Sequence, residues 1–533
     1  MREALLDPAV VYKHRWLTLL VLCISLIVIT LDNTILNVAL PTLAHPTVDG
    51  GLGASASQLQ WIVDSYVIVF AGLLLTAGSL GDRFGRYRAL AVGLAIFGAG
   101  SALSAFATSA NTLIATRALM GIGGAFIMPS TLSIITNVFT NPAERGKAIG
   151  VWAGVSALGI GLGPVTGGFL LEHFWWGSVF IVNIPITIAG LILGYRLVPE
   201  SRDPSKPRLD PIGAVLSIAG LTTVLWSIIE APSKGWGSSQ IVTGFVIGFV
   251  ILAAFMVWEL RSSHPMLDMH FFQNPRFSAA SGAITLTFLA LFGTLFLLTQ
   301  YLQTVLGYST MKAGAVLLPQ AVCIMVFAPL SNVWVRRLGN KVIITTGLLI
   351  VTTSLLLVNT LDAGSSTLHV IAITVLLGLG MANIMAPATD SIMGSLPRAK
   401  AGVGSAVNDT TRQVGGAVGV AVLGSILASH FTSEMTTKLS SLPPSLLALV
   451  KDNVGQAVGI AREAPAAQPF AGQIVQAANE SFVSGMHLAF TIGAAITFIA
   501  AVGVARFLPT RAHDHDVVFV PEAHAAVPIG ASR

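Results

Sequence analysis

Apolar runs long enough to cross a membrane dominate this chain. A spanning helix needs roughly 20 consecutive apolar residues, and fourteen such runs follow one another between residues 16 and 508. Only 10% of the 533 residues are charged and 54% are hydrophobic, whereas a soluble protein carries about 25% charged residues. No soluble fold could bury this much apolar surface, so the sequence predicts an all-α membrane protein with the lipid bilayer as its solvent.

Short polar segments separate the predicted spans, and their charges predict an orientation. An even number of spans places both termini on one side, and the segments on that side hold 22 of the 29 lysines and arginines. Because positively charged loops stay in the cytoplasm, we expect cytoplasmic N- and C-termini. The net charge of +5 then reflects these loops and does not indicate nucleic acid as a partner. The spans lie near residues 16–40, 58–80, 89–107, 112–135, 148–171, 177–198, 211–230, 240–260, 278–301, 312–334, 341–360, 367–392, 402–428 and 485–508.

The first apolar run and the two cysteines exclude other classes of protein. The first run has about 25 residues, which is too long for a secretory signal, and it lacks a small-residue cleavage site. We therefore expect it to remain as the first span. Cys23 and Cys323 both fall within apolar runs, so we expect neither a disulfide nor a metal site.

An internal repeat predicts the domain organisation. The segment MPSTLSII from Met128, followed by PAERGKA from Pro142, resembles APATDSIM from Ala386, followed by PRAKA from Pro397. The repeat pairs the fourth span with the twelfth, and transporters built from parallel repeats bind substrate between their halves. The predicted domains are a six-helix bundle at 1–198, a linker with two inserted spans at 199–277, a second six-helix bundle at 278–508 and a disordered cytoplasmic tail at 509–533.

One long loop is predicted on the outer side, at 429–484. It contains Pro443 and Pro444 and two stretches of mixed polarity, at 445–462 and 468–482. Long loops without structure of their own are uncommon. We therefore expect two short amphipathic helices that form a hairpin over the outer mouth.

A charged, glycine-rich turn follows the second span. It reads GSLGDRFGRYR from Gly78 and closely matches the loop signature of the major facilitator superfamily. Glycines permit a tight turn, and a carboxylate is favoured near the positive end of a helix dipole. A simpler alternative is that these charges only set the membrane topology. The resemblance implies a latch for one conformation of an alternating-access cycle, formed by Gly78, Asp82, Arg83, Gly85 and Arg86.

The fourth and fifth spans resemble two further motifs of this superfamily. Arg117 lies within the fourth span, in RALMGIGGA, where an ionisable residue is costly and points to function. The resemblance implies a role in proton transfer, and snorkelling to the outer interface is the alternative. The fifth span reads GIGLGPVTGG and resembles the antiporter motif of exporters. The matching residues are Gly159, Gly163, Pro164, Gly167 and Gly168.

The first span narrows the resemblance to one family. LDNTILNVALP from Leu31 is similar to the first-helix motif of the fourteen-span drug:proton antiporters. FWWGSVFIVNIP from Phe174 is similar to the quaternary-ammonium and methyl-viologen exporters among them. The resemblance covers about residues 16–508 and implies the major facilitator fold with fourteen transmembrane helices, arranged 6 + 2 + 6. It also implies a monomer in a bacterial inner membrane, with the proton as coupling ion and no other cofactor.

Two carboxylates lie in the outer halves of the first two spans. At ~1.5 Å per residue, Asp32 is roughly 13 Å and Asp64 roughly 9 Å from the outer end. Desolvation favours the protonated form of a lone buried carboxylate. We expect Asp32 and Arg117 to couple transport to protons, and Asp64 to bind a cationic substrate. Two alternatives remain open: a permanent salt bridge between Asp32 and Arg117, and a wetted Asp64 at the rim.

Three further residues are candidates for the substrate site. Asp409 and Arg412 are spaced i, i+3 on one helix face and can pair, so Asp409 serves a substrate only if Arg412 leaves it free. Trp61 and Tyr66 are candidates to line a cavity for flat cations, with lipid contact as the alternative.

These patterns predict a proton-coupled exporter of lipophilic, cationic toxic compounds. An exporter dedicated to one endogenous metabolite, lipid or natural product fits the same motifs. Enzyme chemistry has no support, because no nucleophile, base and orienting group cluster in the sequence. The sequence also lacks a phosphate-binding loop of the kind that ATP-driven pumps need.

Overall fold

The computed structural model describes residues 8–46, 50–202, 210–263, 265, 267, 269–395, 401–465 and 467–509. Within these ranges the regular structure is helical. Of the predicted tail at 509–533, only residue 509 lies within these ranges. Of the repeated segment at 397–401, only residue 401 does.

The helices follow the predicted spans closely. The α-helices are α1 (Pro8–Ala44), α2 (Ala56–Phe84), α3 (Arg86–Ala105), α4 (Ala110–Val138), α5 (Pro142–His173), α6 (Ser178–Ile181), α7 (Asn183–Leu197), α8 (Pro211–Lys234), α9 (Ser239–Arg261), α10 (Pro275–Gln300), α11 (Thr310–Leu338), α12 (Asn340–Leu357), α13 (Thr367–Gly394), α14 (Ala401–Lys438), α15 (Pro444–Val450), α16 (Val454–Glu463) and α17 (Ala471–Phe507). Shorter 3-10 or π turns lie at Met269–Gln273, Tyr301–Val305, Val358–Thr360 and Gln468–Phe470.

Most of these helices have the length and composition of membrane spans. Thirteen helical segments in the described part of the chain are long and apolar enough to cross a membrane, with α6 and α7 counted as one. The remaining predicted run, 148–171, lies on α5, a helix of 32 residues. Each apolar run of the sequence therefore lies on a helix.

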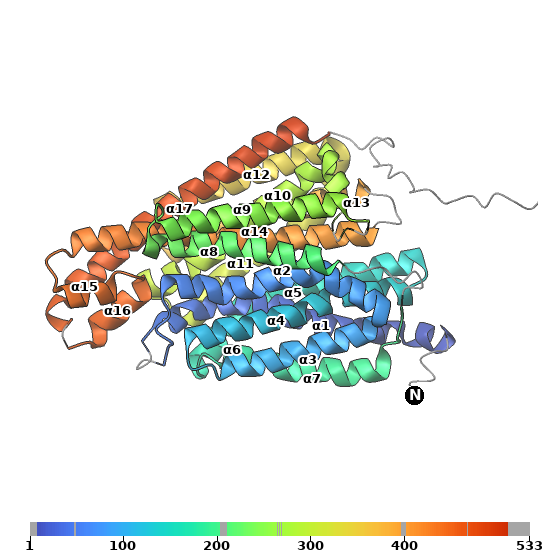
Figure 1. Ribbon diagram of the computed structural model, residues 1–533, viewed down its shortest axis with the longest axis horizontal. Helices are drawn as coiled ribbons and strands as arrows, with labels where there is room; N and C mark the ends of the chain where they lie inside the picture. The colour runs from blue at the N-terminus through green and yellow to red at the C-terminus, as the bar shows by residue number, and fades with distance from the viewer. Residues whose placement is uncertain are drawn as a thin grey trace, which may run out of the picture.

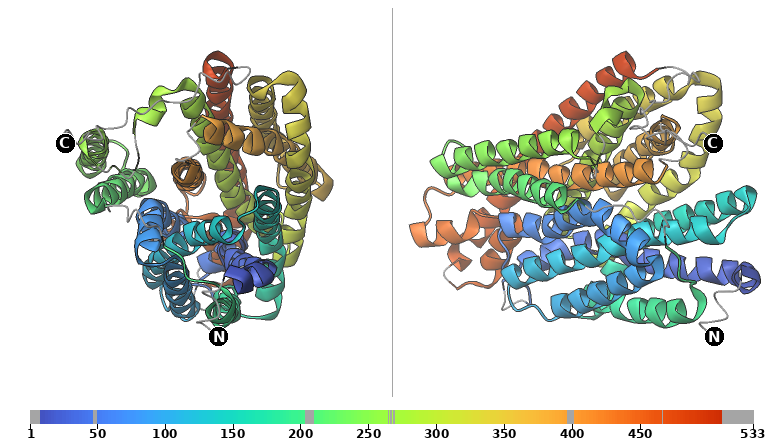
Figure 2. Two further views of the ribbon diagram at one scale, coloured as in Figure 1. Left: turned by 90° about the vertical axis from the view of Figure 1, so that its right-hand side faces the viewer. Right: turned by 45° about the vertical axis from the view of Figure 1, so that its right-hand side comes forward.

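The helices form two bundles with a separate helix pair beside them (Figures 1 and 2). Helices α1 to α7 pack together as one half, and α10 to α17 as the other. The pair α8 and α9 packs through α8 against α2 of the first half and α14 of the second. In the left view of Figure 2 this pair stands apart from both bundles.

The two halves repeat one packing pattern. Helix α4 packs on α2 and α3, and α13 packs on α11 and α12 in the same way. Both α4 and α13 contain a proline, Pro129 and Pro387, inside the repeated segments. A proline inside a helix removes one backbone hydrogen bond and bends the helix. The repeat found in the sequence therefore corresponds to equivalent helices of the two halves.

The predicted outer loop is shorter than 429–484 because its flanking helices continue far beyond the bilayer. Helix α14 has 38 residues and ends at Lys438, and α17 begins at Ala471. A helix of that length measures about 57 Å, against about 30 Å of hydrocarbon. The stretch at 468–482, predicted as a separate outer helix, is mostly the start of α17. The other predicted helix consists of α15 and α16.

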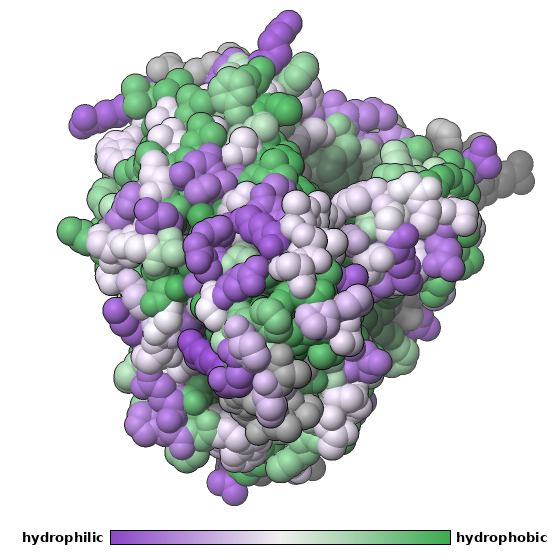
Figure 3. All heavy atoms as spheres, turned by 90° about the vertical axis from the view of Figure 1, so that its left-hand side faces the viewer, coloured by the Kyte–Doolittle hydropathy of each residue, from purple (hydrophilic) through white to green (hydrophobic). Residues whose placement is uncertain are grey.

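A hairpin of α15 and α16 caps one end of the molecule, which we call the hairpin end. The opposite end, where α1 begins and α17 ends, is the terminal end (Figure 1). Hydrophilic side chains are scattered across the hairpin end in Figure 3. The Lys438 ammonium pairs with Glu434 at 2.8 Å and with Glu480 at 3.3 Å, which ties the extensions of α14 and α17 together.

The hairpin belongs to the second half but bonds to the first. The Asn453 side-chain amide donates to the Ala54 carbonyl at 2.9 Å, and that of Gln456 donates to the Gly53 carbonyl at 2.8 Å. Nearby, the Gln303 amide donates to the Val38 carbonyl at 2.9 Å. These contacts hold the two halves together at the hairpin end.

Candidate functional site

An ion pair between α1 and α4 lies in the interior of the first half. Asp32 has 0% of its surface exposed and Arg117 has 1%. One terminal nitrogen of Arg117 lies 2.5 Å from the Oδ2 atom of Asp32. Arg117 therefore points inward and does not snorkel to the outer interface, and the two residues predicted to act together do form a pair.

The rest of the Arg117 side chain is also enclosed by partners. Its Nε donates to the Ile62 carbonyl at 3.2 Å, and a terminal nitrogen lies 3.8 Å from the Met120 sulfur. The Tyr66 ring packs beneath the guanidinium, 4.4 Å from its central carbon. Burying an arginine is costly unless its donors are satisfied. The carboxylate, the carbonyl and the ring together meet that need.

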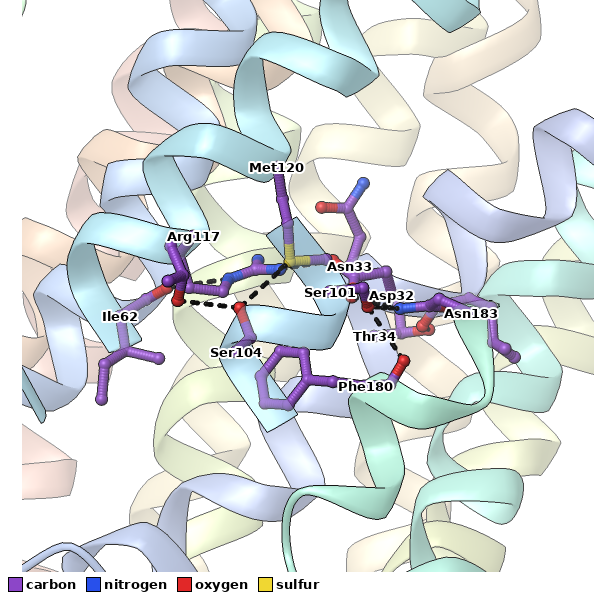
Figure 4. A network of polar contacts seen from close by, with 12 residues as sticks. Asp32, Asn33, Thr34, Ile62, Ser101, Ser104, Arg117, Met120, Phe180 and Asn183 are labelled. Atoms are coloured by element: carbon purple, nitrogen blue, oxygen red, sulfur yellow. Dashed lines mark hydrogen bonds and ion pairs between the residues drawn. The ribbon is translucent and has the colours of Figure 1, made fainter. Parts of the chain in front are cut away.

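Two polar residues that sequence reasoning did not single out complete this site (Figure 4). The Asn183 amide nitrogen at the start of α7 donates to the Oδ1 atom of Asp32 at 3.0 Å. The same nitrogen also donates to the Ser101 hydroxyl on α3 at 3.0 Å. In the sequence, Asn183 appears only as part of the motif FWWGSVFIVNIP, and that motif assigned it no role in the site. Its partners, 82 and 151 positions away along the chain, become visible only in the fold.

Asp64 lies deep in the structure and has no polar partner there. Its exposed fraction is 0%, and neither carboxylate oxygen has a hydrogen-bond partner among the described residues. The alternative of a wetted residue at the rim is therefore wrong in this conformation. An unpaired charge in such a place is very costly, which marks Asp64 as a position that needs a proton or a cation.

The direction of Asp64 follows from its neighbours on α2. Arg117 of α4 contacts the Ile62 carbonyl and the Tyr66 ring, so this side of α2 faces α4. Asp64 is two positions from each of these residues. Two positions correspond to about 200° around a helix, so Asp64 lies on the opposite side of α2. One turn before Asp64, the Gln60 side chain accepts a hydrogen bond from Ser425 of α14 at 3.3 Å. Asp64 therefore faces the second half, away from the Asp32–Arg117 pair.

Two of the other candidate substrate residues, Asp409 and Tyr66, contact charged side chains near them in the structure. Asp409 pairs with Arg412 at 3.8 Å, and Arg412 also donates to the Thr389 hydroxyl at 3.2 Å. Asp409 is thus not a free acid in this conformation. Tyr66 is fully buried against Arg117, and Trp61 is partly buried.

The charged motif lies at the junction of α2 and α3 and is closed by contacts within the first half. Asp82 lies in the last turn of α2 and only Gly85 separates the helices, so the expectation that Asp82 lies at the positive end of a helix dipole is wrong. Asp82 pairs with Arg86 at 2.7 Å, and Arg86 also donates to the Ser133 carbonyl at 3.4 Å. Glu200, just after α7, accepts the Tyr87 backbone amide at 3.1 Å and lies 3.6 Å from Arg88. Glu200 was not predicted, and it caps the start of α3 as a side-chain acceptor.

We expect Gly85→Ala to destabilise this turn and to slow transport. Gly85 has φ +127°, and an added Cβ would lie 2.6 Å from the Glu200 carboxylate. Backbone strain of this kind costs roughly 1–3 kcal/mol, to which the clash adds. Thermal unfolding and initial transport rates of the purified protein measure the effect. Gly237→Ala, with open space around the added Cβ, is the control, and equal behaviour of the two variants would contradict the expectation.

The glycines of α5 allow two neighbouring helices to approach closely. A Cβ at Gly159 or Gly163 would overlap Thr30 or Thr34 of α1, and one at Gly167 would lie 2.9 Å from Ile35. A Cβ at Gly168 would overlap the backbone of Met311 on α11, in the other half. Small residues at this spacing permit such contacts.

Helix α11 carries its own small residue at this contact. A Cβ at Gly314 would overlap the Pro164 carbonyl of α5. The Thr310 hydroxyl donates to the Gly168 carbonyl at 3.1 Å. The motif at 159–168 thus belongs to a junction that joins both halves, and Gly314 is a member that sequence reasoning missed.

The fold, the buried ion pair and the glycine junction define a transporter built from two repeated halves. Residues 22–420 match the family model of the Major Facilitator Superfamily, and the chain belongs to this family. The prediction of a transporter of this superfamily is therefore confirmed.

Proteins named for drug efflux or drug resistance are similar to this chain over nearly its whole length. The multidrug efflux pump LfrA of Mycolicibacterium smegmatis is 39% identical over 92% of this chain and 96% of its own. The methyl viologen resistance protein SmvA of Salmonella typhimurium is 33% identical over 92% of this chain and 98% of its own. The tetracenomycin C resistance and export protein of Streptomyces glaucescens is 34% identical over 91% of this chain and 90% of its own.

Solved structures match the fold at lower identity. A bacterial homologue of the human lysosomal transporter Spinster, solved in an inward-facing conformation, aligns with a TM-score of 0.64 and 16% identity. The alignment covers 94% of this chain and 99% of that one.

Proposed function

We propose that this protein is a proton-coupled exporter of lipophilic, cationic toxic compounds that works by alternating access. The observation that carries the proposal is the buried Asp32–Arg117 pair, together with a second buried acid, Asp64, whose carboxylate has no hydrogen-bond partner in the described part of the chain. The similarity to relatives named for multidrug efflux and methyl viologen resistance supports this class of cargo.

Protonation of Asp32 would change how tightly α1 and α4 are held together. While Asp32 is charged, its attraction to Arg117 holds α1 against α4. A proton on Asp32 removes that attraction, and Arg117 keeps only neutral partners, the Ile62 carbonyl and the Tyr66 ring. Protonation and deprotonation therefore favour different arrangements of these helices, which is how a ligand shifts a conformational equilibrium.

Because the hairpin end is closed, we infer that this conformation is the one that binds cargo from the opposite, terminal end. The halves are bonded there through Gln303 and Val38 and through the hairpin. An exporter closed on the outer side receives cargo from the cytoplasm. We assign the terminal end to the cytoplasm, because the lysines and arginines concentrate in the segments on that side.

The proposed topology has fourteen spans in a bacterial inner membrane. It adds α5 to the thirteen spans that meet the length and composition criteria. The arrangement is six helices, the pair α8 and α9, and six more, with both termini cytoplasmic. The proposed cargo site lies between the halves, where Asp64 faces α14, and the protein acts as a monomer.

Efflux from proteoliposomes under an imposed proton gradient tests the proposal. The probes are tetraphenylphosphonium, methyl viologen and a neutral lipophilic dye, which differ in charge. We expect accumulation of the cations against their gradient, and loss of that accumulation when a protonophore is added. Transport that ignores the proton gradient would refute the coupling.

A dedicated exporter of one natural product is the second candidate. The similarity to the tetracenomycin C resistance and export protein favours it. Transport of a single compound from a chemically diverse panel, with no response to the two cations, would decide for this candidate.

We expect Asp64→Asn to weaken the binding of cations at least about tenfold, or about 1.4 kcal/mol, and to leave neutral cargo nearly unchanged. A buried carboxylate offsets the desolvation of a cation, and no side chain or backbone group that the structure describes hydrogen-bonds to Asp64 and would compete. Equilibrium binding of tetraphenylphosphonium, methyl viologen and the neutral dye measures the difference.

Asp409→Asn is the matched comparison, because Arg412 already neutralises that acid. We expect a small effect from it, and stronger binding of methyl viologen in Arg412→Ala. Unchanged affinities in all three variants would mean that these charges are structural.

A further inference from the structure

The last span of the first half passes from α6 to α7 beside the ion pair. Helix α6 ends at Ile181 and α7 begins at Asn183, and Val182 between them keeps helical backbone angles. The Phe180 carbonyl accepts the Ser101 hydroxyl at 2.9 Å. Asn183, at the first position of α7, has 0% of its surface exposed. In Figure 4 its amide points at Asp32.

The contacts around Asn183 fix which way its amide points. The Ser101 hydroxyl donates to the Phe180 carbonyl, so toward Asn183 it acts as an acceptor. The Asp32 carboxylate also accepts. Only the nitrogen of the amide donates, and it must therefore face both partners. The amide oxygen of Asn183 is buried and has no hydrogen-bond partner among the described residues.

We propose that Asn183 is a positioning residue that holds the Asp32 carboxylate and sets the pH at which Asp32 exchanges its proton. This inference rests on the proposed function, in which Asp32 carries the proton. The two oxygens of Asp32 have different partners: Arg117 binds Oδ2 and Asn183 binds Oδ1. When Arg117 moves away, Asn183 still donates to the carboxylate, because it is anchored separately by Ser101.

The unpaired oxygen of Asn183 suits the other protonation state. A protonated Asp32 becomes a donor, and a turn of the Asn183 amide about its last torsion presents the oxygen as an acceptor. The turn gives up the hydrogen bond to Ser101 and forms one to the carboxylic acid. This second arrangement is the weaker one, because a hydrogen bond to a charged group contributes more than one between neutral groups and the turn gives up Ser101. Asn183 therefore favours the charged form of Asp32 overall.

Other charges around Asp32 are few. The titratable and charged side chains that face it are Arg117 from α4 and Tyr66 from α2. From α7 it meets the neutral Asn183, which in turn bonds to Ser101 of α3. Helices α5 and α10 carry their charged residues near their ends, away from this depth. Asp64 faces the second half but can also exchange a proton for a cation, so every protein in the test below, the parent included, carries Asp64→Asn.

The test measures proton release when tetraphenylphosphonium binds to the purified protein in weak buffer, over a range of pH. Asn183→Leu removes the donor and keeps the number and branching of the side-chain heavy atoms. A hydrogen bond to a charged group favours that charged form, so its loss keeps Asp32 protonated to higher pH. We expect the midpoint of proton release to rise by about one to two pH units.

Two further variants make the test specific. Thr187→Val lies one turn away on α7, where the Thr187 hydroxyl bonds only to the Ile184 carbonyl of its own helix, and we expect an unchanged midpoint. Asn183→Ala also removes the donor and serves if the leucine variant fails to fold. A purely structural role for Asn183 would lower thermal stability and rates without moving the midpoint.

Asp32→Asn separates this inference from the proposed function. If that variant releases no proton while both Asn183 variants keep the parental midpoint, the inference is overturned and the proposed coupling stands. If Asp32→Asn still releases a proton and still drives transport, both are overturned. A shift in Asn183→Leu, matched by an equal shift in Thr187→Val, also counts against the inference.

Discussion

Replacing Asp32 with asparagine is expected to reduce gradient-driven efflux to the level of empty liposomes. The variant keeps the shape of the side chain but cannot bind and release a proton. It also leaves Arg117 without its counter-charge, and removing one partner of a buried ion pair costs about 3–5 kcal/mol. Loss of transport alone would therefore not separate a coupling defect from a folding defect.

The double variant Asp32→Asn/Arg117→Gln makes that separation. Both partners become neutral, so we expect much of the lost thermal stability to return while gradient-driven transport stays absent. Energy-independent exchange of labelled tetraphenylphosphonium is expected to persist in the double variant, since it needs no net proton movement. A single Asp32→Asn variant that still concentrates the cation would exclude Asp32 as the proton carrier.

Replacing Gly314 with valine is expected to lower transport about tenfold or more by forcing the two halves apart. The added Cβ would overlap the Pro164 carbonyl of α5, and backbone atoms cannot rotate away. Overpacking typically costs about 1–3 kcal/mol, and each 1.4 kcal/mol is tenfold in an equilibrium. Because α5 and α11 belong to different halves, this cost falls on the state closed at the hairpin end.

Crosslinking measures this shift directly. Cysteines introduced at Val38 and Gln303, in a background without Cys23 and Cys323, report closure through a bifunctional thiol crosslinker, because the Gln303 side-chain amide reaches the Val38 carbonyl at 2.9 Å. We expect a lower crosslinking yield in Gly314→Val. Gly282→Val on α10 has no heavy atom near its added Cβ and is the control. Parental yield and transport in Gly314→Val would contradict the proposed junction.

The closed junction also explains why exporter motifs appear as glycine rows. On α5, Gly159 and Gly163 lie against α1, whereas Gly168 lies against α11. One helix thus packs against both α1, which carries Asp32, and α11 of the other half. The sequence of α5 shows only that these positions lack side chains. The structure shows that α1 and α11 approach α5 closely at these positions.

The sequence by itself determined the membrane class, the positions of the helices and the pairing of the two halves. These features depend on local hydrophobicity, on loop charge and on a repeated pattern, and each can be read over a few dozen residues. It also pointed to Asp32 and Arg117, because ionisable residues inside apolar runs are rare enough to stand out. The extent of α14 and α17 was missed, because polar residues beyond the bilayer carry no hydropathy signal although the helix continues.

Only the tertiary structure decided which polar groups meet. It paired Asp32 with Arg117 and Asn183, left Asp64 without a hydrogen-bond partner among the residues it describes, and paired Asp409 with Arg412. It also brought Glu200 to the turn at Gly85 and Gly314 to Pro164. Most of these contacts join residues that are far apart in the chain. Their strength depends on distance and burial, and neither can be read from the spacing of residues in the sequence. A buried polar group is costly alone and stabilising when paired, so the role of each residue follows from its neighbours in space.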